Sequence, residues 1–422
     1  MRFLETLRQA FRIPDLRKRI FFTLWMFLVF RLGTHVPVPG IEAEVLQGMF
    51  QEGTLFGLLD LFSGGALRFF SIFAMSITPY INASIIMQLL TVVIPKFEQL
   101  SKMGPEGRKQ LQQYIRYGTV ILAFIQATGM SFFMRNQGAL VRGDFVSMAV
   151  IAITLTAGTA FLMWLGEQIT EKGIGNGISL LIFAGIVSQL PGGAGRLLAF
   201  LQAGTVNIFN IAVVGVLAIV VIAGIVWVQE GQRRIPVRYA KRVVGTKMYG
   251  GQQTHIPMKV NQAGVIPVIF ASSVLAFPPT LASFIAHPWA QRLASSLEYG
   301  QPLYTAIFIL FIIFFTYFYT AVTFNPQDVA NNIRKYGGFI PGYRPGKPTA
   351  RYLDRILIRI TLVGALFLAA VSVMPIFFGD LVNIPNIFFG GTALLIIVGV
   401  ALETNKQIEA HLLMRHMPGF LR

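Results

Sequence analysis

The feature that most constrains this chain is a succession of ten apolar stretches along its length. A transmembrane helix needs about 20 mainly apolar residues to cross the hydrocarbon core of a bilayer. Only 13% of the 422 residues are charged, whereas about 25% are charged in a soluble globule. The sequence therefore predicts an all-α polytopic membrane protein with ten transmembrane helices. The predicted spans are residues 20–36, 71–94, 114–134, 145–167, 176–190, 208–229, 261–285, 303–324, 356–376 and 384–403.

Lysine and arginine are concentrated in alternate connections between these spans. The basic set comprises residues 1–19, 95–116, 168–175, 230–260, 325–359 and 404–422. The other set carries only Arg135, Arg142, Arg196 and Arg292, while Arg31 and Arg68 lie in or beside apolar segments. Because cytosolic loops collect basic residues, both termini are predicted to lie in the cytosol. Ten spans divide into two blocks of five, which would insert in opposite senses as an inverted repeat does.

Residues 55–70 are apolar but contain Asp60 and the cluster Ser63-Gly64-Gly65. Joined to the next span they would be about twice the length that a bilayer requires. Glycine costs a helix about 1 kcal/mol relative to alanine, so the cluster predicts a break. We expect a half-helix, a turn and then a full span. The half-helix would either pack inside protein and line a cavity or lie on the membrane surface as an amphipathic segment.

The sequence lacks the patterns of an enzyme. It has no cysteine, no H-E-x-x-H, no G-x-S-x-G and no Walker P-loop. No acidic residue lies near the middle of a predicted span, whereas intramembrane carboxylates usually mark proton or ion pathways. This argues against a proton-coupled transporter and an intramembrane aspartyl protease. No catalytic residue, metal site or cofactor is predicted, and no cleavable signal peptide is recognised.

Two connections, residues 230–260 and 325–355, are long and basic and also contain tyrosine, proline and glycine. Turn residues of this kind hold a loop in a defined shape. The loops could therefore bind an anionic partner such as RNA phosphate or an acidic protein surface. Alternatively, they are ordinary cytosolic loops attracted to anionic lipid.

Several short motifs stand out by their glycine, proline and polar residues. They are Phe62–Leu67, Pro79–Leu90, Gly166–Thr170 with Gly173–Ser179, Gly264–Ser273, Tyr343–Gly346 and Gly390–Ile396. Taken in this order, they closely resemble the SecY protein-translocation channel family. The resemblance runs from about residue 12 to the end of the chain.

The resemblance implies ten helices in two inverted five-helix halves around an hourglass pore. Residues 1–19 would form a cytosolic basic segment, 20–190 the first half, 191–403 the second half and 404–422 a cytosolic tail. The half-helix at about 56–68 would be a plug in the outer funnel of the resting channel. Its residues are Phe56, Leu59, Phe62, Gly64, Gly65 and Leu67.

The resemblance also assigns an apolar pore ring and a lateral gate. The ring would consist of Ile77, Ile81, Ile178, Ile182, Ile269 and Ile396. Spacings of i, i+4 place each of the first two pairs on one helix face; on sequence alone such pairs are typical of packing or lipid-facing residues. The gate, which opens toward lipid, would include Asn82, Gln126 and Ser273. Asn82 departs from the small hydroxyl residue expected at that position.

The basic loops correspond in this family to docking sites for the SecA motor ATPase and the ribosome. The residues implied are Arg233, Arg234, Arg238, Lys241, Arg242, Arg344 and Lys347. Further implied partners are the small membrane subunits SecE and SecG, signal sequences and preproteins, and the lipid bilayer. The implied location is the bacterial cytoplasmic membrane.

The leading interpretation is thus a protein-conducting channel. The alternative is an inverted-repeat secondary transporter for small molecules, which should show broken helices at matching places in both halves. Only one clear break is apparent, in the second span. A membrane-embedded enzyme is disfavoured by the lack of an intramembrane acid, base or nucleophile.

Overall fold

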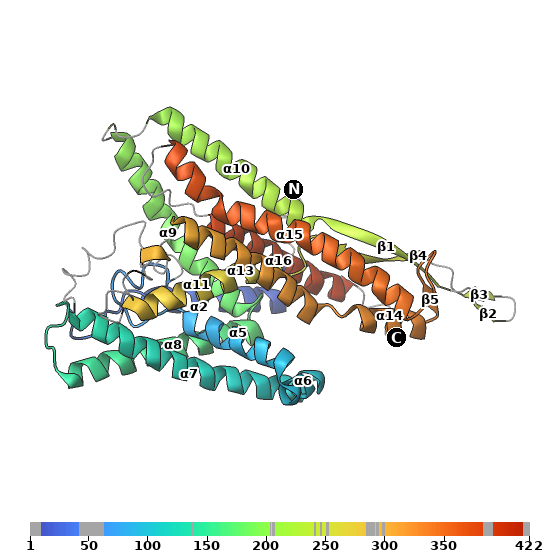
Figure 1. Cartoon of the computed structure of the whole chain (residues 1–422), viewed down its shortest axis with the longest axis horizontal. Helices are drawn as coiled ribbons and strands as arrows, with labels where there is room; N and C mark the ends of the chain where they lie inside the picture. The colour runs from blue at the N-terminus through green and yellow to red at the C-terminus, as the bar shows by residue number, and fades with distance from the viewer. Residues whose placement is uncertain are drawn as a thin grey trace.

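Each of the ten predicted spans corresponds to one helix of the structure, a computed structural model of the chain (Figure 1). It describes residues 10–41, 63–136, 138–202, 204, 207–239, 242–244, 247–249, 253–283, 292, 295–297, 300–382 and 391–416. The helices are α2 (Pro14–Gly33), α5 (Thr78–Val93), α7 (Pro105–Asn136), α8 (Phe145–Lys172), α9 (Gly177–Gln202), α10 (Ile208–Glu230), α11 (Ile266–Ser283), α13 (Pro302–Thr323), α15 (Lys347–Val382) and α16 (Gly391–His416).

Not every one of these helices would be recognised as a span by length and apolar composition alone. Within the described residues six qualify, and a seventh if α5 and the helix that follows it are counted together. That following helix, α6 (Pro95–Lys102), is bent by 101° from α5 after the break at Ile94. Within α6 the Lys102 ammonium donates a hydrogen bond to Oε1 of Glu98 at 2.6 Å, and this bond raises the pKa of Lys102.

The second span is shorter than predicted. Helix α5 has 16 residues and begins at Thr78, with Pro79 at its start, so residues 71–77 of the predicted span are not helical. From Gly64 to Ile77 the chain forms successive turns, and Phe70 and Ser76 adopt positive φ. Non-helical backbone at membrane depth is stable only where protein or a water-filled cavity surrounds it, and most of this segment is buried.

The fifth span is longer than predicted. Helix α9 has 26 residues and continues through Pro191. It starts after a sharp turn in which Gly175 has φ +85°. The Asn176 side chain accepts from the backbone N–H groups of Ile178 and Ser179 at 3.1 and 3.3 Å, which caps the helix.

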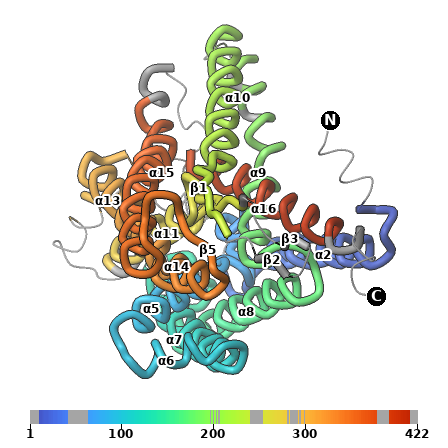
Figure 2. The backbone as a smooth tube through the Cα atoms, turned by 90° about the vertical axis from the view of Figure 1, so that its right-hand side faces the viewer, coloured from blue at the N-terminus to red at the C-terminus, as the bar shows by residue number. Residues whose placement is uncertain are grey.

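The helices form two groups that meet along a seam. Figure 2, which looks along the bundle, separates α5, α7 and α8 from α10, α13 and α15. Helix α11 of the second half contacts α5 and α7 of the first, and α16 contacts α9. One hydrophobic cluster continues across these contacts, from Phe30 and Leu165 on one side to Phe308 and Leu395 on the other. The largest apolar core therefore lies between the halves.

At one end of the bundle the two basic loops form a structure that the sequence did not predict. Strand β1 (Gln232–Tyr239) pairs antiparallel with β4 (Gln253–Lys259) and with β5 (Gly338–Phe339). Strands β2 (Arg242–Val244) and β3 (Lys247–Tyr249) form a small hairpin beyond them, and α14 (Pro326–Lys335) packs alongside β5. We call β1, β4, β5 and α14 together the platform; it lies at the right-hand end of Figure 1.

Candidate functional site

All six predicted ring isoleucines belong to, or pack against, the hydrophobic cluster that continues from one half into the other. Five of them are at most 8% exposed, and the sixth, Ile178, is partly buried against the same cluster. They come from the start of α5 and from α9, α11 and α16, so both halves contribute. The backbone bond from Ile81 N to Ile77 O, 3.0 Å long, fixes the first pair in one helical turn.

Ile178 differs from the other five in what it touches. A Cβ atom built on Gly166 of α8 would lie 2.5 Å from Ile178 Cδ1. The side chain therefore fills the space that this glycine leaves and packs α9 against α8. Ile182, one turn further along α9, is 3% exposed and lies within the shared cluster itself.

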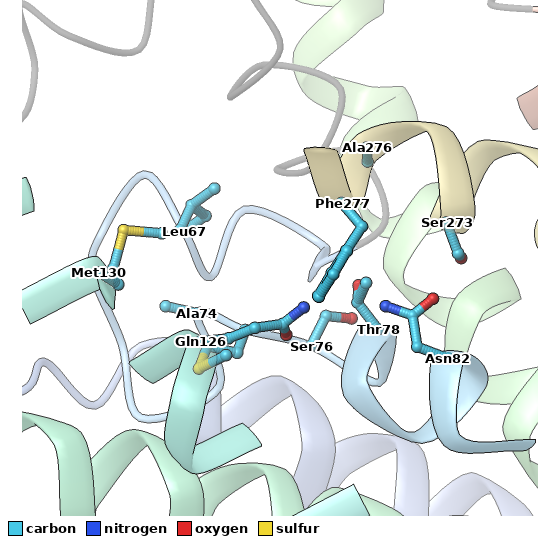
Figure 3. A pocket seen from close by; sticks show the side chains of 11 residues that line it. Leu67, Ala74, Ser76, Thr78, Asn82, Gln126, Met130, Ser273, Ala276 and Phe277 are labelled. Carbon is cyan, nitrogen blue, oxygen red and sulfur yellow. The ribbon is translucent and has the colours of Figure 1, made fainter. Parts of the chain in front are cut away.

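All three predicted gate residues line one small cavity at the seam (Figure 3). Asn82 comes from α5, Gln126 from α7 and Ser273 from α11, so the cavity lies where the halves meet. Its volume is about 40 Å³, which leaves room for about one water molecule. Ser76 and Thr78 add hydroxyl groups to its wall, and Leu67, from the predicted plug, closes another side.

Asn82 is the unusual member of this group. It is 7% exposed, and neither its side-chain oxygen nor its nitrogen has a hydrogen-bond partner. A buried polar group without a partner costs about 1–3 kcal/mol. Among the described residues the Asn82 amide has no partner while the seam is closed, and the cavity beside it has room for about one water molecule.

Of the predicted plug residues, Gly64, Gly65 and Leu67 lie in a turn rather than in a helix. Positive φ angles of 69° and 88° at the two glycines explain the difference, because a right-handed helix requires negative φ. The break predicted at Ser63-Gly64-Gly65 is thus present, and the predicted half-helix does not continue to residue 68. Phe56, Leu59 and Phe62 lie outside the described residues.

The docking arginines lie on the platform. Arg233, Arg234 and Arg238 are exposed on β1, while Ile235 and Val237 between them are buried against the platform's apolar core. Lys347 is exposed at the start of α15. Lys241 lies outside the described residues, and Arg242 is described only in its backbone, at the start of β2.

Arg344 projects from a turn that is held on both sides. The Thr349 hydroxyl donates to the Arg344 carbonyl at 2.8 Å, and the rings of Tyr343 and Tyr352 stack at 4.0 Å. The exposed Arg344 and Arg334 line the same open hollow of about 540 Å³. Strand β5 joins this loop to the first basic loop, since Arg238 pairs with Phe339. The two predicted docking loops are therefore one continuous surface.

A buried ion pair escaped the sequence analysis. Glu167, whose side chain is 8% exposed, accepts from Arg116 at 2.8 Å through both carboxylate oxygens. Gln112 adds a third contact at 3.3 Å. These bonds tie α7 to α8 within the first half. The sequence placed Glu167 at the end of a span, but the residues are 51 positions apart and nothing local signals the pairing.

Known proteins resemble this chain in sequence. The SecY family model matches residues 71–405. A protein translocase subunit SecY from Halalkalibacterium halodurans is 51% identical, covering 99% of this chain and 100% of the relative. The Escherichia coli protein of the same name is 45% identical, covering 94% and 92%.

Solved structures show the same fold. A structure described as that of a protein conducting channel matches with a TM-score of 0.70 at 20% identity, covering 99% of both chains. Sec61 in a canine ribosome–channel complex matches with a TM-score of 0.65 at 19% identity, also covering 99% of both chains. The predicted fold class is thereby confirmed, and the extent of the family match together with near-half identity over the whole length shows that the chain belongs to the SecY family.

Proposed function

We propose that this chain forms the pore through which unfolded preproteins cross the bacterial cytoplasmic membrane and from which membrane helices pass sideways into lipid. Its named relatives are protein translocase subunits, and the chain is a channel component rather than an enzyme. The observation that carries the proposal is the apolar cluster in which isoleucines from both halves meet.

The isoleucine cluster would seal the resting pore. A narrow apolar constriction resists wetting and so blocks ions. Isoleucine side chains on separate helices can also move apart around a peptide, because dispersion contacts are individually weak. In this proposal Ile77, Ile81, Ile182, Ile269 and Ile396 form the constriction, and Ile178 supports it from its contact with α8. The plug would close the funnel on the outer side.

The cavity at the seam would be the lateral gate. Polar contacts between membrane helices contribute only about 0.6 kcal/mol on average, and the Asn82 side chain forms no hydrogen bond to any described residue across this cavity, so polar bonds to Asn82 do not hold the halves together. A hydrophobic segment in the pore could therefore separate α5 from α11 and reach lipid. The unpartnered amide of Asn82 favours that separation further.

The platform would receive the partner that drives transport. Its exposed arginines present positive charge on a backbone held by strand pairing, which suits the phosphates of a ribosome or the carboxylates of SecA. A structural neighbour of this chain was solved in a ribosome–channel complex. The platform and both termini would then face the cytosol, and SecE and SecG would be the small membrane partners.

The transporter alternative finds little support in the described residues. Its hallmark is a carboxylate or another charged group at the binding site in mid-membrane. The buried carboxylate of Glu167 is instead neutralised by Arg116 near the end of α8. The broken second span has no described counterpart with successive turns in the second half.

The absence of cysteine allows a direct test. A single cysteine is introduced as Ile182→Cys or Ile396→Cys, and a preprotein with one cysteine is stalled during transport in membrane vesicles. We expect disulfide crosslinks from both positions to the stalled chain. Ile219→Cys on α10, where the native side chain is 68% exposed, is the matched control and should not crosslink. Equal crosslinking at all three positions, or at the control alone, would refute the pore.

A further inference from the structure

A positively charged side chain lies in the first span without an acidic partner. Arg31 is half-buried in the last turn of α2. Charged residues within membrane spans are costly and usually have a specific function. Among the described residues Arg31 takes part in neither of the ion pairs Lys102–Glu98 and Arg116–Glu167. The contacts of Arg31 must therefore be sought elsewhere.

Arg31 uses one nitrogen to connect three segments of the chain. Its Nη1 atom donates to the carbonyl oxygen of Gly64 at 2.8 Å and to Oγ of Ser188 at 3.3 Å. Gly64 belongs to the turn that ends the proposed plug, and Ser188 belongs to α9. Ser188 in turn donates to the carbonyl of Gly185 at 2.7 Å. A cationic donor forms stronger hydrogen bonds to carbonyl oxygens than a neutral donor does.

The turn that Arg31 binds lies very close to α9. A Cβ atom built on Gly64 would lie 2.9 Å from Cα of Gly185 and 3.4 Å from Ser188 Oγ. Gly64 also has φ +69°, which favours glycine. Only a glycine thus allows the backbone to approach α9 while presenting its carbonyl to the guanidinium. The bond from Leu67 N to Ser63 Oγ, 3.2 Å long, holds the same turn together.

We propose that Arg31 is a latch that positions the base of the plug in the resting channel. The guanidinium fastens residues 63–67 to α2 and α9, so this turn can move away from α9 only after the Gly64 carbonyl is released. This inference rests on the proposed function and adds a positioning residue that the ring and the gate do not include.

The latch can be tested with Arg31→Met, which keeps a long side chain but removes the charge and the donors. Resting ion conductance is measured in reconstituted vesicles, and export is measured for a preprotein with a weakened signal sequence. Loss of a charge-assisted bond to a carbonyl is expected to raise both by about tenfold. Arg31→Lys keeps the charge but loses the planar guanidinium group, and it should raise resting conductance and export of this preprotein about threefold.

The matched control is Arg19→Met at the other end of α2. Arg19 also donates to a glycine carbonyl, that of Gly173, at 3.4 Å, but it lies far along the helix from the plug. This variant should conduct as the unmodified chain does. Thermal melting in detergent separates loss of the latch from loss of folding; if Arg31→Met does not fold, Arg31→Lys decides the question.

The outcomes distinguish this inference from the proposed function. The double variant Ile81→Ser and Ile182→Ser is reconstituted in parallel as a positive control for leak. If it leaks while the Arg31 variants conduct like Arg19→Met, the latch is wrong and the apolar seal is correct. If the double variant does not leak, the proposed seal itself is wrong. Raised conductance in the Arg31 variants alone supports the latch.

Discussion

The seam and the platform both join segments that are far apart in the sequence, but they use different bonds. Across the seam, α11 meets α5 and α7 through apolar side chains and an amide without a partner. In the platform, backbone hydrogen bonds fix β1 against β4 over seven residue pairs and against β5 over two. Backbone pairing specifies register, whereas side-chain packing in a membrane lacks a hydrophobic force that draws helices together.

This difference indicates which part moves. A wall that must open and close repeatedly is best held by many weak contacts, each lost separately. A surface that transmits force from a motor or a ribosome must keep its shape while it is pushed. We therefore expect variants in the platform to affect coupling to partners and variants in the seam to affect sealing and gating. Four predictions test this division, from the largest expected effect to the smallest.

Reversing the charge of Arg344 should almost abolish partner-driven export. Like charges brought together at an interface cost several kcal/mol, which corresponds to more than about a hundredfold. Export driven by SecA or by the ribosome is measured in vesicles with Arg344→Glu. Arg142→Glu, an exposed reversal in the connection between α7 and α8, is the control and should export normally. Normal export by Arg344→Glu would show that the platform does not bind the partner that drives export.

Opening the isoleucine cluster should produce a leak without loss of partner binding. Each isoleucine contributes about 1.5–3 kcal/mol of apolar burial, so Ile81→Ser with Ile182→Ser should raise resting conductance at least about tenfold. Conductance is read in planar bilayers, and SecA affinity is read separately. If this variant instead binds SecA with a changed affinity and its resting ion conductance is unchanged, the seam would act in partner binding and not in sealing, contrary to the prediction.

Breaking the buried ion pair between α7 and α8 should lower the thermal stability of the first half. Arg116→Met leaves the Glu167 carboxylate buried and uncompensated, which costs about 3–5 kcal/mol when such a pair is fully enclosed. Because Arg116 is 43% exposed, we expect a smaller loss, about 2 kcal/mol. Thermal melting in detergent measures it. Full recovery in the double variant Arg116→Met with Glu167→Met would confirm that the single variant fails because of the unpaired carboxylate.

Removing the unpartnered amide should stabilise the closed seam slightly. Asn82→Leu has a similar size and no polar group, so the closed state should gain about 1 kcal/mol. Insertion of a weakly hydrophobic signal sequence should then slow about fivefold, while a strongly hydrophobic one is unaffected. The rate of insertion is measured as the rate at which each signal sequence becomes crosslinked to α5. Faster insertion of the weak signal would mean that the amide closes the gate rather than opening it.

The elements that depend on local pattern could be predicted from the sequence. All ten helices were found because an apolar run of span length is a local signal. Their ends were less accurate, since residues 71–77 are as apolar as a helix but form turns, and α9 continues through Pro191. Neither outcome follows from hydropathy: the turns over residues 71–77 are mostly buried by the rest of the chain, whereas α9 beyond Pro191 is mostly exposed and its length has no packing explanation.

The site could be predicted only through the family resemblance. The ring isoleucines belong to one hydrophobic cluster and the gate residues line one cavity, whereas hydropathy alone describes the same isoleucines as lipid-facing or packing residues; their roles as ring and gate stay predictions. The β1–β5 pairing, the Arg116–Glu167 bond and the Arg31 latch connect residues far apart in the chain. Such long-range contacts have no local signature, so they required the structure.

The turns between Gly64 and Ile77 also determine where the wall can part. Several of their amides bond within the stretch or to Val36, but they lack the continuous bonding of a helix, and hydrocarbon offers no partner to a peptide group that is left over. If the halves separate as proposed, this stretch should stay covered by protein. A segment that leaves sideways should then pass beside α5, whose backbone is helical. The position of α5 along the bilayer normal would thus set the depth at which the segment enters lipid.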